Sequence, residues 1–180
     1  MKRFLVLLFP GFEEIEAFVP IDLLRRSKIE VVTASFYDQL KVSGAHSIIA
    51  CADETLCTVK LETFDGLFIP GGPGVFKLEN NTTILETIQF FCHHKKWLAA
   101  ICAAPILLKS AGCLPEHFTA HACVTEQLIG CDAQKNVVVD ENVITGRGPG
   151  AVFPFAFELI ERLTSSNVVL QLKTSIHYEK

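Results

Sequence analysis

The chain has 180 residues, of which 49% are hydrophobic and 20% are charged, and its formal net charge is -4 at pH 7. This composition is typical of a globular protein, and we expect a single domain that spans residues 1–180. The small negative charge and the lack of a basic cluster argue against nucleic acid and against an anionic membrane surface as partners.

The amino-terminal apolar run, residues 4–9, follows two basic residues and faintly imitates a signal peptide. The run is too short for that, and it ends in Pro10-Gly11 and an acidic segment. We therefore interpret it as a buried strand and expect no membrane segment and a cytoplasmic location. Seven cysteines without C-x-x-C spacing predict free thiols in a reducing compartment and no metal site.

The first half of the chain alternates apolar runs with one amphipathic segment. Acids begin this segment and arginines end it, as the helix macrodipole favours, while Pro20 predicts a kink or a restart as a second helix. In chain order we expect a strand at residues 4–9, a turn at Pro10-Gly11, a helix at 13–26, a strand at 29–35, an edge hairpin of 39–42 with 47–52, an ambiguous segment at 58–62, and a strand at 67–69 that ends in Pro70-Gly71-Gly72.

The second half continues the alternation, which predicts a parallel sheet covered by helices on both faces. The turns after the strands should then share the carboxyl edge of the sheet. In chain order we expect a helix capped by Thr82 or Thr83 that runs to about 94, a strand at 98–101, a helix that Gly112 ends, a strand at 118–123, a helical turn at 125–129, a hairpin of 137–139 with 143–145, and helices at 151–164 and 168–172.

The strand at residues 98–101 stops at Cys102, and Pro105 begins a helix shortly afterwards. A side chain at this junction stands where ligands collect in open α/β folds. Free N–H groups and the helix dipole there favour the thiolate, which is the nucleophilic form of cysteine. Cys102 is therefore a candidate nucleophile, although a cysteine at a strand end can also be a small apolar core residue.

Five segments together carry a resemblance to a known family: residues 9–17 (FPGFEEIEA), 69–72 (IPGG), 99–105 (AAICAAP), 119–121 (TAH) and 145–150 (TGRGPG). With these motifs in this order, the chain resembles the ThiJ/PfpI superfamily, in particular the branch of the Parkinson-disease-associated protein deglycase and its bacterial relatives. The resemblance runs nearly end to end. It implies a flavodoxin-like three-layer α/β sandwich with a mainly parallel central sheet, and a homodimer.

By this resemblance Cys102 matches the family's reactive cysteine, and Glu16 matches the glutamate that hydrogen-bonds its sulfur. Two neighbouring acids cannot both ionise easily, so a protonated Glu16 that donates to a Cys102 thiolate is favoured. The resemblance also implies an oxyanion site at Gly71 and Gly72, with the amides of Gly72 and Ala103 as donors. The alternatives are that Glu16, like its neighbouring acids, only serves the helix dipole, and that the glycines only form a tight loop.

His121 aligns with a histidine near the cysteine, but no evident acid would orient it, so a direct catalytic role stays open. The resemblance implies that Arg147 lies at the dimer interface or beside the pocket, that Arg26 contributes to dimer contacts, and that Cys51 is at best a secondary redox site. Pro73 departs from the amide or small residue of many relatives, and it leaves the shape of the pocket undecided.

The resemblance implies a cofactor-independent enzyme that acts on small 2-oxoaldehydes such as methylglyoxal, or on their glycation adducts, with Cys102 as nucleophile. An alternative is a redox sensor or chaperone that uses an oxidisable Cys102. A second alternative is a cysteine peptidase or amidase, which would need an oriented Cys–His–acid set.

Overall fold

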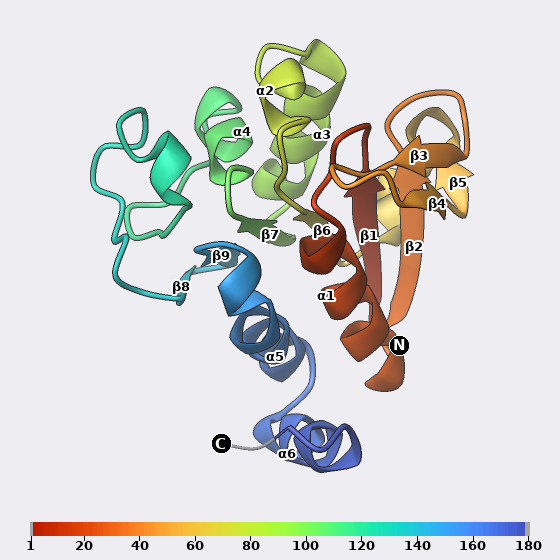
Figure 1. Ribbon diagram of the computed structural model, residues 1–180, viewed down its shortest axis with the longest axis vertical. Coiled ribbons are helices and arrows are strands. Elements are labelled where there is room, and N and C mark those ends of the chain that lie inside the picture. Colours follow the sequence, from red (N-terminus) through yellow and green to blue (C-terminus); the bar gives the residue numbers. More distant parts are fainter. Residues whose placement is uncertain (1, 179–180) are drawn as a thin grey trace.

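The computed structural model describes residues 2–178, which build a central sheet with helices on both faces (Figure 1). The sheet has seven strands in the order β5-β2-β1-β6-β7-β9-β8, and a separate antiparallel hairpin pairs β3 with β4. The strands are β1 (Arg3–Leu8), β2 (Glu30–Ser35), β3 (Lys41–Ser43), β4 (Ile49–Cys51), β5 (Glu54–Thr55), β6 (Gly66–Ile69), β7 (Trp97–Ile101), β8 (Val137–Asp140) and β9 (Val143–Gly146).

The helices form two layers, with α1 packed beside α5 on one face of the sheet and α2, α3 and α4 on the other (Figure 1). No helix within residues 2–178 is long and apolar enough to cross a membrane. The helices are α1 (Glu14–Arg26), α2 (Val75–Leu78), α3 (Thr82–His93), α4 (Pro105–Ser110), α5 (Val152–Leu163) and α6 (Ser166–Ser175), with short 3-10 turns η1 (Leu56–Thr58), η2 (Leu61–Thr63), η3 (Ala122–Val124) and η4 (Pro149–Ala151).

The three central strands β1, β6 and β7 are apolar because helices cover them on both faces. The fully buried side chains of these strands include Phe4, Leu5, Leu67, Phe68 and Ile101. Neighbouring strands of this sheet are parallel from β5 through β2, β1, β6 and β7 to β9. In this sheet only β8 runs antiparallel to its neighbour, β9. This order confirms the predicted flavodoxin-like α/β sandwich.

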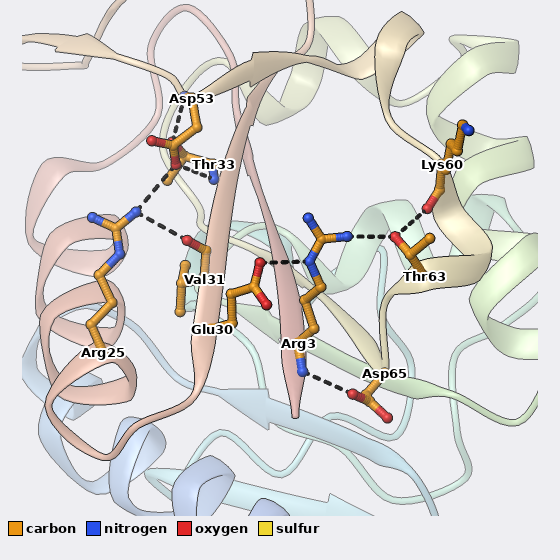
Figure 2. A network of polar contacts seen from close by, with 9 residues as sticks. All are labelled: Arg3, Arg25, Glu30, Val31, Thr33, Asp53, Lys60, Thr63 and Asp65. Atoms are coloured by element: carbon orange, nitrogen blue, oxygen red, sulfur yellow. Dashed lines mark hydrogen bonds and ion pairs between the residues drawn. The ribbon is translucent and has the colours of Figure 1, made fainter. Parts of the chain in front are cut away.

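A network of polar side chains joins the first strands to the segments around them (Figure 2). Arg3 donates to Glu30 at 2.8 Å and to Thr63 at 2.6 Å, and its backbone N–H donates to Asp65 at 2.8 Å. The network therefore connects the start of β1 to β2 and to the segment that leads into β6. It orders the amino end of the sheet, opposite the edge where the strand-end turns meet.

The predicted strand at residues 118–123 is wrong. Its backbone groups do bond, but to partners outside any ladder: the N–H of Thr119 donates to the Thr145 hydroxyl at 2.9 Å, and the N–H of His121 donates to the Cys102 carbonyl at 2.9 Å. Both edges of β9 are already occupied, by β7 and β8, so the segment has no free strand edge there. Residues 125–129 form successive turns, in which the N–H of Leu128 donates to the Val124 carbonyl at 3.1 Å, so the predicted helical turn is present only as this single bond and no helix follows.

Two helix predictions also need correction. The helix α1 is assigned without a break through the buried Pro20, so no second helix begins there. Packing of its apolar face outweighs the local cost of proline. The cap of α3 is Asn81, whose side chain accepts from the N–H of Thr83 at 3.0 Å, rather than either threonine.

Candidate active site

Cys102 lies at a sharp strand-to-helix junction between β7 and α4, which we call the elbow. Its φ angle of 64° places it in the left-handed region, which costs a non-glycine residue free energy unless the surroundings hold it there. They do so here: its N–H donates to the Gly146 carbonyl at 2.8 Å, and its carbonyl accepts from His121. The residue is 9% exposed, so its thiol lies just beneath the surface.

The three strand-end turns meet at this cysteine, as the alternation of strands and helices predicts. The Gly71 carbonyl accepts from the N–H of Glu13 at 2.9 Å, which joins the turn after β6 to the turn after β1. A methyl group on Gly71 would lie 2.5 Å from Glu16 Oε2 and 2.6 Å from Cys102 Cβ. Gly71 therefore has glutamate on one side and cysteine on the other, and only glycine fits between them.

Glu16 is fully buried, in the first turn of α1. Its Oε2 atom accepts from the N–H of Gly71 at 2.8 Å, whereas its Oε1 atom has no hydrogen-bond partner within residues 2–178. Burial raises the pKa of Glu16 to about 7, and the carboxylate of Glu13 adds to this shift. Near neutral pH the buried carboxyl group thus readily holds a proton, and its unpaired oxygen is the natural place for it.

The pKa of the Cys102 thiol is raised, by burial first and by the neighbouring Glu16 second, while the N–H of Ala103 opposes the shift by hydrogen-bonding the sulfur. This reverses our expectation that the helix terminus would favour the thiolate. The reason is physical: α4 has only 6 residues, so its dipole is weak beside the cost of burying a charge next to a carboxylate. A thiolate at Cys102 therefore requires that Glu16 keep its proton.

The sequence predicts an oxyanion site formed by two backbone N–H groups, those of Gly72 and Ala103. Among the residues that the structure describes, the N–H groups of Gly72 and Ala103 donate to no oxygen atom. Gly72 has a φ of 105°, and a methyl group there would lie 2.4 Å from the Gly11 carbonyl, so its backbone packs tightly on the first turn. Pro73 is exposed and leaves the Gly72 donor in place. An oxyanion site needs donors that are not committed to another oxygen, and the assignment of this pair stays a prediction.

His121 is placed beside the elbow by its backbone, but its ring is not set up as a general base. Its Nδ1 accepts from the Cys123 N–H at 3.2 Å, so the neutral ring carries its proton on Nε2. Within residues 2–178 no carboxylate contacts this ring. The oriented Cys–His–acid set of a peptidase is therefore not assembled in the described part of the chain.

The remaining candidate residues lie further from the thiol. Arg147 is exposed and lines a cavity of about 210 Å³ with His121 and the turn before α5, which places it beside the elbow. Arg26 pairs with Asp22 at 2.7 Å at the far end of α1, about 15 Å along the helix from Glu16. Cys51 is exposed on the β3–β4 hairpin.

Sequence reasoning missed two features near the site. Glu14 is 4% exposed and accepts from the backbone N–H of His46 at 2.7 Å and of Ile48 at 3.3 Å, so it fastens the β3–β4 hairpin to α1 instead of merely serving the helix dipole. Burial alone would raise the pKa of Glu14, but these hydrogen bonds outweigh it and lower the pKa. The second feature is Cys123, an exposed thiol near Cys102 that contributes slightly to the raised pKa of the Cys102 thiol.

Among the described residues, one cluster combines side chains that can bind a metal ion: Glu13, Glu14 and His46. Their possible ligand atoms lie within 4.8 Å of one another. His46 Nδ1 lies 2.9 Å from Glu14 Oε2 and 3.5 Å from Glu13 Oε2. Both oxygens of Glu14 already have hydrogen-bonding partners. The cluster is thereby explained as a structural contact of the hairpin.

Comparison with known proteins places this geometry in a family. A model of the DJ-1/PfpI family matches residues 2–162. The chain is 32% identical over 182 residues to the Parkinson disease protein 7 homolog of Danio rerio, covering 97% of this chain and 96% of that protein. It is 36% identical over 167 residues to the glutathione-independent glyoxalase DJR-1.2 of Caenorhabditis elegans, covering 90% and 89%.

The structural comparison agrees with the sequence comparison. The crystal structure of Drosophila melanogaster DJ-1beta matches with a TM-score of 0.94 at 29% identity and covers 99% of both chains. The structure of oxidized Toxoplasma gondii DJ-1 matches with a TM-score of 0.94 at 31% identity and covers 100% of both. On fold, motifs and full-length similarity, this chain belongs to the DJ-1/PfpI family.

Proposed function

We propose that this protein is a cofactor-independent enzyme that converts small 2-oxoaldehydes such as methylglyoxal into 2-hydroxy acids, with Cys102 as nucleophile. The observation that carries the proposal is the unpaired, buried Oε1 atom of Glu16 beside a cysteine held in the left-handed region. A protonated Glu16 can donate from this oxygen to the sulfur, which stabilises the thiolate that burial alone would disfavour. One relative of this chain is named a glutathione-independent glyoxalase.

In the first step the Cys102 thiolate attacks the aldehyde carbon of methylglyoxal, and a hemithioacetal forms. The oxygen that becomes negative in this step is stabilised by the N–H groups of Gly72 and Ala103, and the Ala103 N–H turns to it from the sulfur. The proton for that oxygen comes from Glu16, which is then a carboxylate and can act as a base. The pKa of about 7 suits Glu16 to both roles near neutral pH.

In the second step Glu16 transfers a proton from the former aldehyde carbon to the neighbouring carbon, through an enediol, and leaves a thioester of lactate on Cys102. Water then hydrolyses the thioester, which releases lactate and restores the thiol. The net reaction adds one water to methylglyoxal and needs no electron acceptor. The same nucleophile could release a sugar-derived aldehyde from a protein or nucleotide adduct, which would be deglycation.

The test is lactate formation from methylglyoxal by the wild-type protein and two cysteine variants. Cys102→Ala should abolish lactate formation, while Cys51→Ala, which alters an exposed thiol on the β3–β4 hairpin, should leave it nearly unchanged. Equal activity in the wild-type protein and in Cys102→Ala would overturn the proposal. Stoichiometric oxidation of Cys102 without continuing lactate release would favour the redox sensor, since Glu16 Oε1 could also hydrogen-bond a sulfinate.

We also propose that the protein forms a homodimer through the face of α1. Phe18, Phe153 and Tyr178 are 38%, 37% and 38% exposed, and with Arg26 they border an apolar hollow of about 530 Å³. Contiguous exposed aromatic side chains of this kind mark interaction surfaces. Sedimentation equilibrium should give twice the monomer mass, and Phe153→Asp should lower it; a monomeric wild-type protein would refute the proposal.

A further inference from the structure

Two cysteines that the proposed chemistry does not use share one cavity, at the opposite edge of the sheet from Cys102. Cys92 lies in the last turn of α3, and Cys113 follows α4 directly after Gly112. Both line a cavity of about 450 Å³ beside the start of β9. Cys92 is partly exposed and Cys113 is buried, so one thiol of the pair is accessible and the other lies behind it.

Hydrogen bonds hold the two segments against each other. Gln89, one turn before Cys92 on the same face of α3, donates to the Ala111 carbonyl at 3.1 Å. The Cys113 thiol donates to the same carbonyl at 3.4 Å, and its N–H donates to the Leu108 carbonyl at 2.8 Å. The turn after α4 is thereby fixed on the face of α3 that carries Cys92.

The surroundings assign different roles to the two thiols. Burial and the neighbouring Cys92 raise the pKa of Cys113 to about 12, so Cys113 keeps its proton at neutral pH. The more accessible Cys92 is then the first thiol to meet an external reagent. Cys113 has its partner sulfur beside it and can react second.

We propose that Cys92 and Cys113 form a dithiol site that is oxidised by small external disulfides to an intramolecular disulfide bond. The Cys92 thiolate attacks one sulfur of the reagent, which forms a mixed disulfide and releases one thiol. Cys113 then gives up its proton and attacks the Cys92 sulfur, which closes the Cys92–Cys113 bond and releases the second thiol. The protein loses two protons and two electrons, and the reagent disulfide gains them as two thiols.

The charge of the cavity selects among such reagents. Glu116, Asp140 and Glu141 line it, together with Lys95. A cationic disulfide such as cystamine should therefore react faster than the anionic oxidised glutathione, and added salt should reduce the difference. The disulfide bond would close a loop that contains all of β7, Cys102 and α4. It would therefore restrain the two elements that hold Cys102.

The experiment treats the full-length protein with cystamine, blocks the remaining thiols and maps tryptic peptides under non-reducing conditions. Trypsin cuts after Lys95 and Lys109, which puts Cys92, Cys102 and Cys113 on different peptides. A second digestion with a glutamate-specific protease cuts after Glu116, which separates Cys113 from Cys123 and Cys131. We expect a peptide that joins Cys92 to Cys113, formed roughly tenfold faster with cystamine than with oxidised glutathione at low ionic strength.

Matched variants separate the two steps. Cys113→Ser should accumulate half of the cystamine molecule on Cys92, because the second attack is lost. Cys92→Ser should leave Cys113 unmodified, while the exposed Cys51 and Cys57 gain adducts in every variant and report that the reagent is active. A wild-type protein that keeps a stable adduct on Cys92 without the joined peptide would overturn the proposal, and this result needs no variant to fold.

Discussion

Glu16→Gln should change how the stability of the fold depends on pH, and the effect is cleanest in a Cys102→Ala background, where the thiol cannot share the proton. Burial is the largest cause of the raised Glu16 pKa and remains when the thiol is removed, whereas the hydrogen bond with Cys102, which lowers the pKa, is lost, so the value with the thiol present is a lower bound. In the unfolded chain Glu16 loses its proton near its ordinary pKa of 4.5, whereas in the fold it keeps the proton to about 7.

Between these two values the unfolded state binds fewer protons than the folded state, so stability falls as the pH rises. Moving the pKa from 4.5 to about 7 corresponds to a loss of about 3 kcal/mol, complete above the folded value. Glutamine cannot ionise and avoids this loss. Relative to the protein that keeps Glu16, the Glu16→Gln variant should therefore gain at least about 3 kcal/mol of unfolding free energy as the pH rises from about 4 to above the folded pKa of Glu16.

The assay is urea unfolding of Cys102→Ala and of Cys102→Ala combined with Glu16→Gln across this pH range. All other titrating groups are common to both proteins, so their contributions cancel in the difference. A difference that stays constant with pH would refute the reasoning, because it would mean that Glu16 ionises in the fold as easily as in the unfolded chain.

Two further predictions concern the groups around the thiol. Gly71→Ala should cost about 1–3 kcal/mol of stability and most of the lactate-forming activity, since its methyl group would collide with Glu16 and Cys102. The control is Gly150→Ala, whose methyl group would meet no atom within 4 Å and should reduce neither stability nor activity. Urea unfolding and lactate assays measure both. His121→Ala should lower the lactate-forming rate by less than about tenfold, because a general base would be worth about a hundredfold or more; a larger loss would show that the ring acts directly.

The sequence was sufficient to predict the layers of the fold and the meeting of the turns. Apolar strands such as residues 4–9 and 98–101 are buried on both faces, and alternation with helices leaves few arrangements for a parallel sheet. Because the carboxyl ends of parallel strands share one edge, Cys102 and Gly71 had to come close together. Glu16 follows from the motif position, and its burial confirms that it differs from an ordinary first-turn acid.

The features that escaped prediction depend on contacts distant in sequence. Glu14 looks like Glu13 until the β3–β4 hairpin folds over it and His46 supplies its partner. Thr119 is a residue type that favours strands, but both edges of β9, the strand beside it, are already paired with other strands. The raised pKa of Cys102 is likewise a property of its burial, which the local sequence of a strand end cannot report.

The most direct test of the proposed proton-sharing pair is the alkylation rate of Cys102 against pH, in the wild-type protein and in Glu16→Gln. The pair loses its first proton near pH 7, the pKa of the Glu16 carboxyl. If the protonated Glu16 hydrogen-bonds the sulfur, as we propose, the resulting charge rests on the thiolate, and the wild-type rate should rise with a midpoint there. An amide donates less strongly, and the midpoint of Glu16→Gln should move to higher pH. Coincident profiles, or a wild-type rate that rises only in strong alkali, would contradict the account.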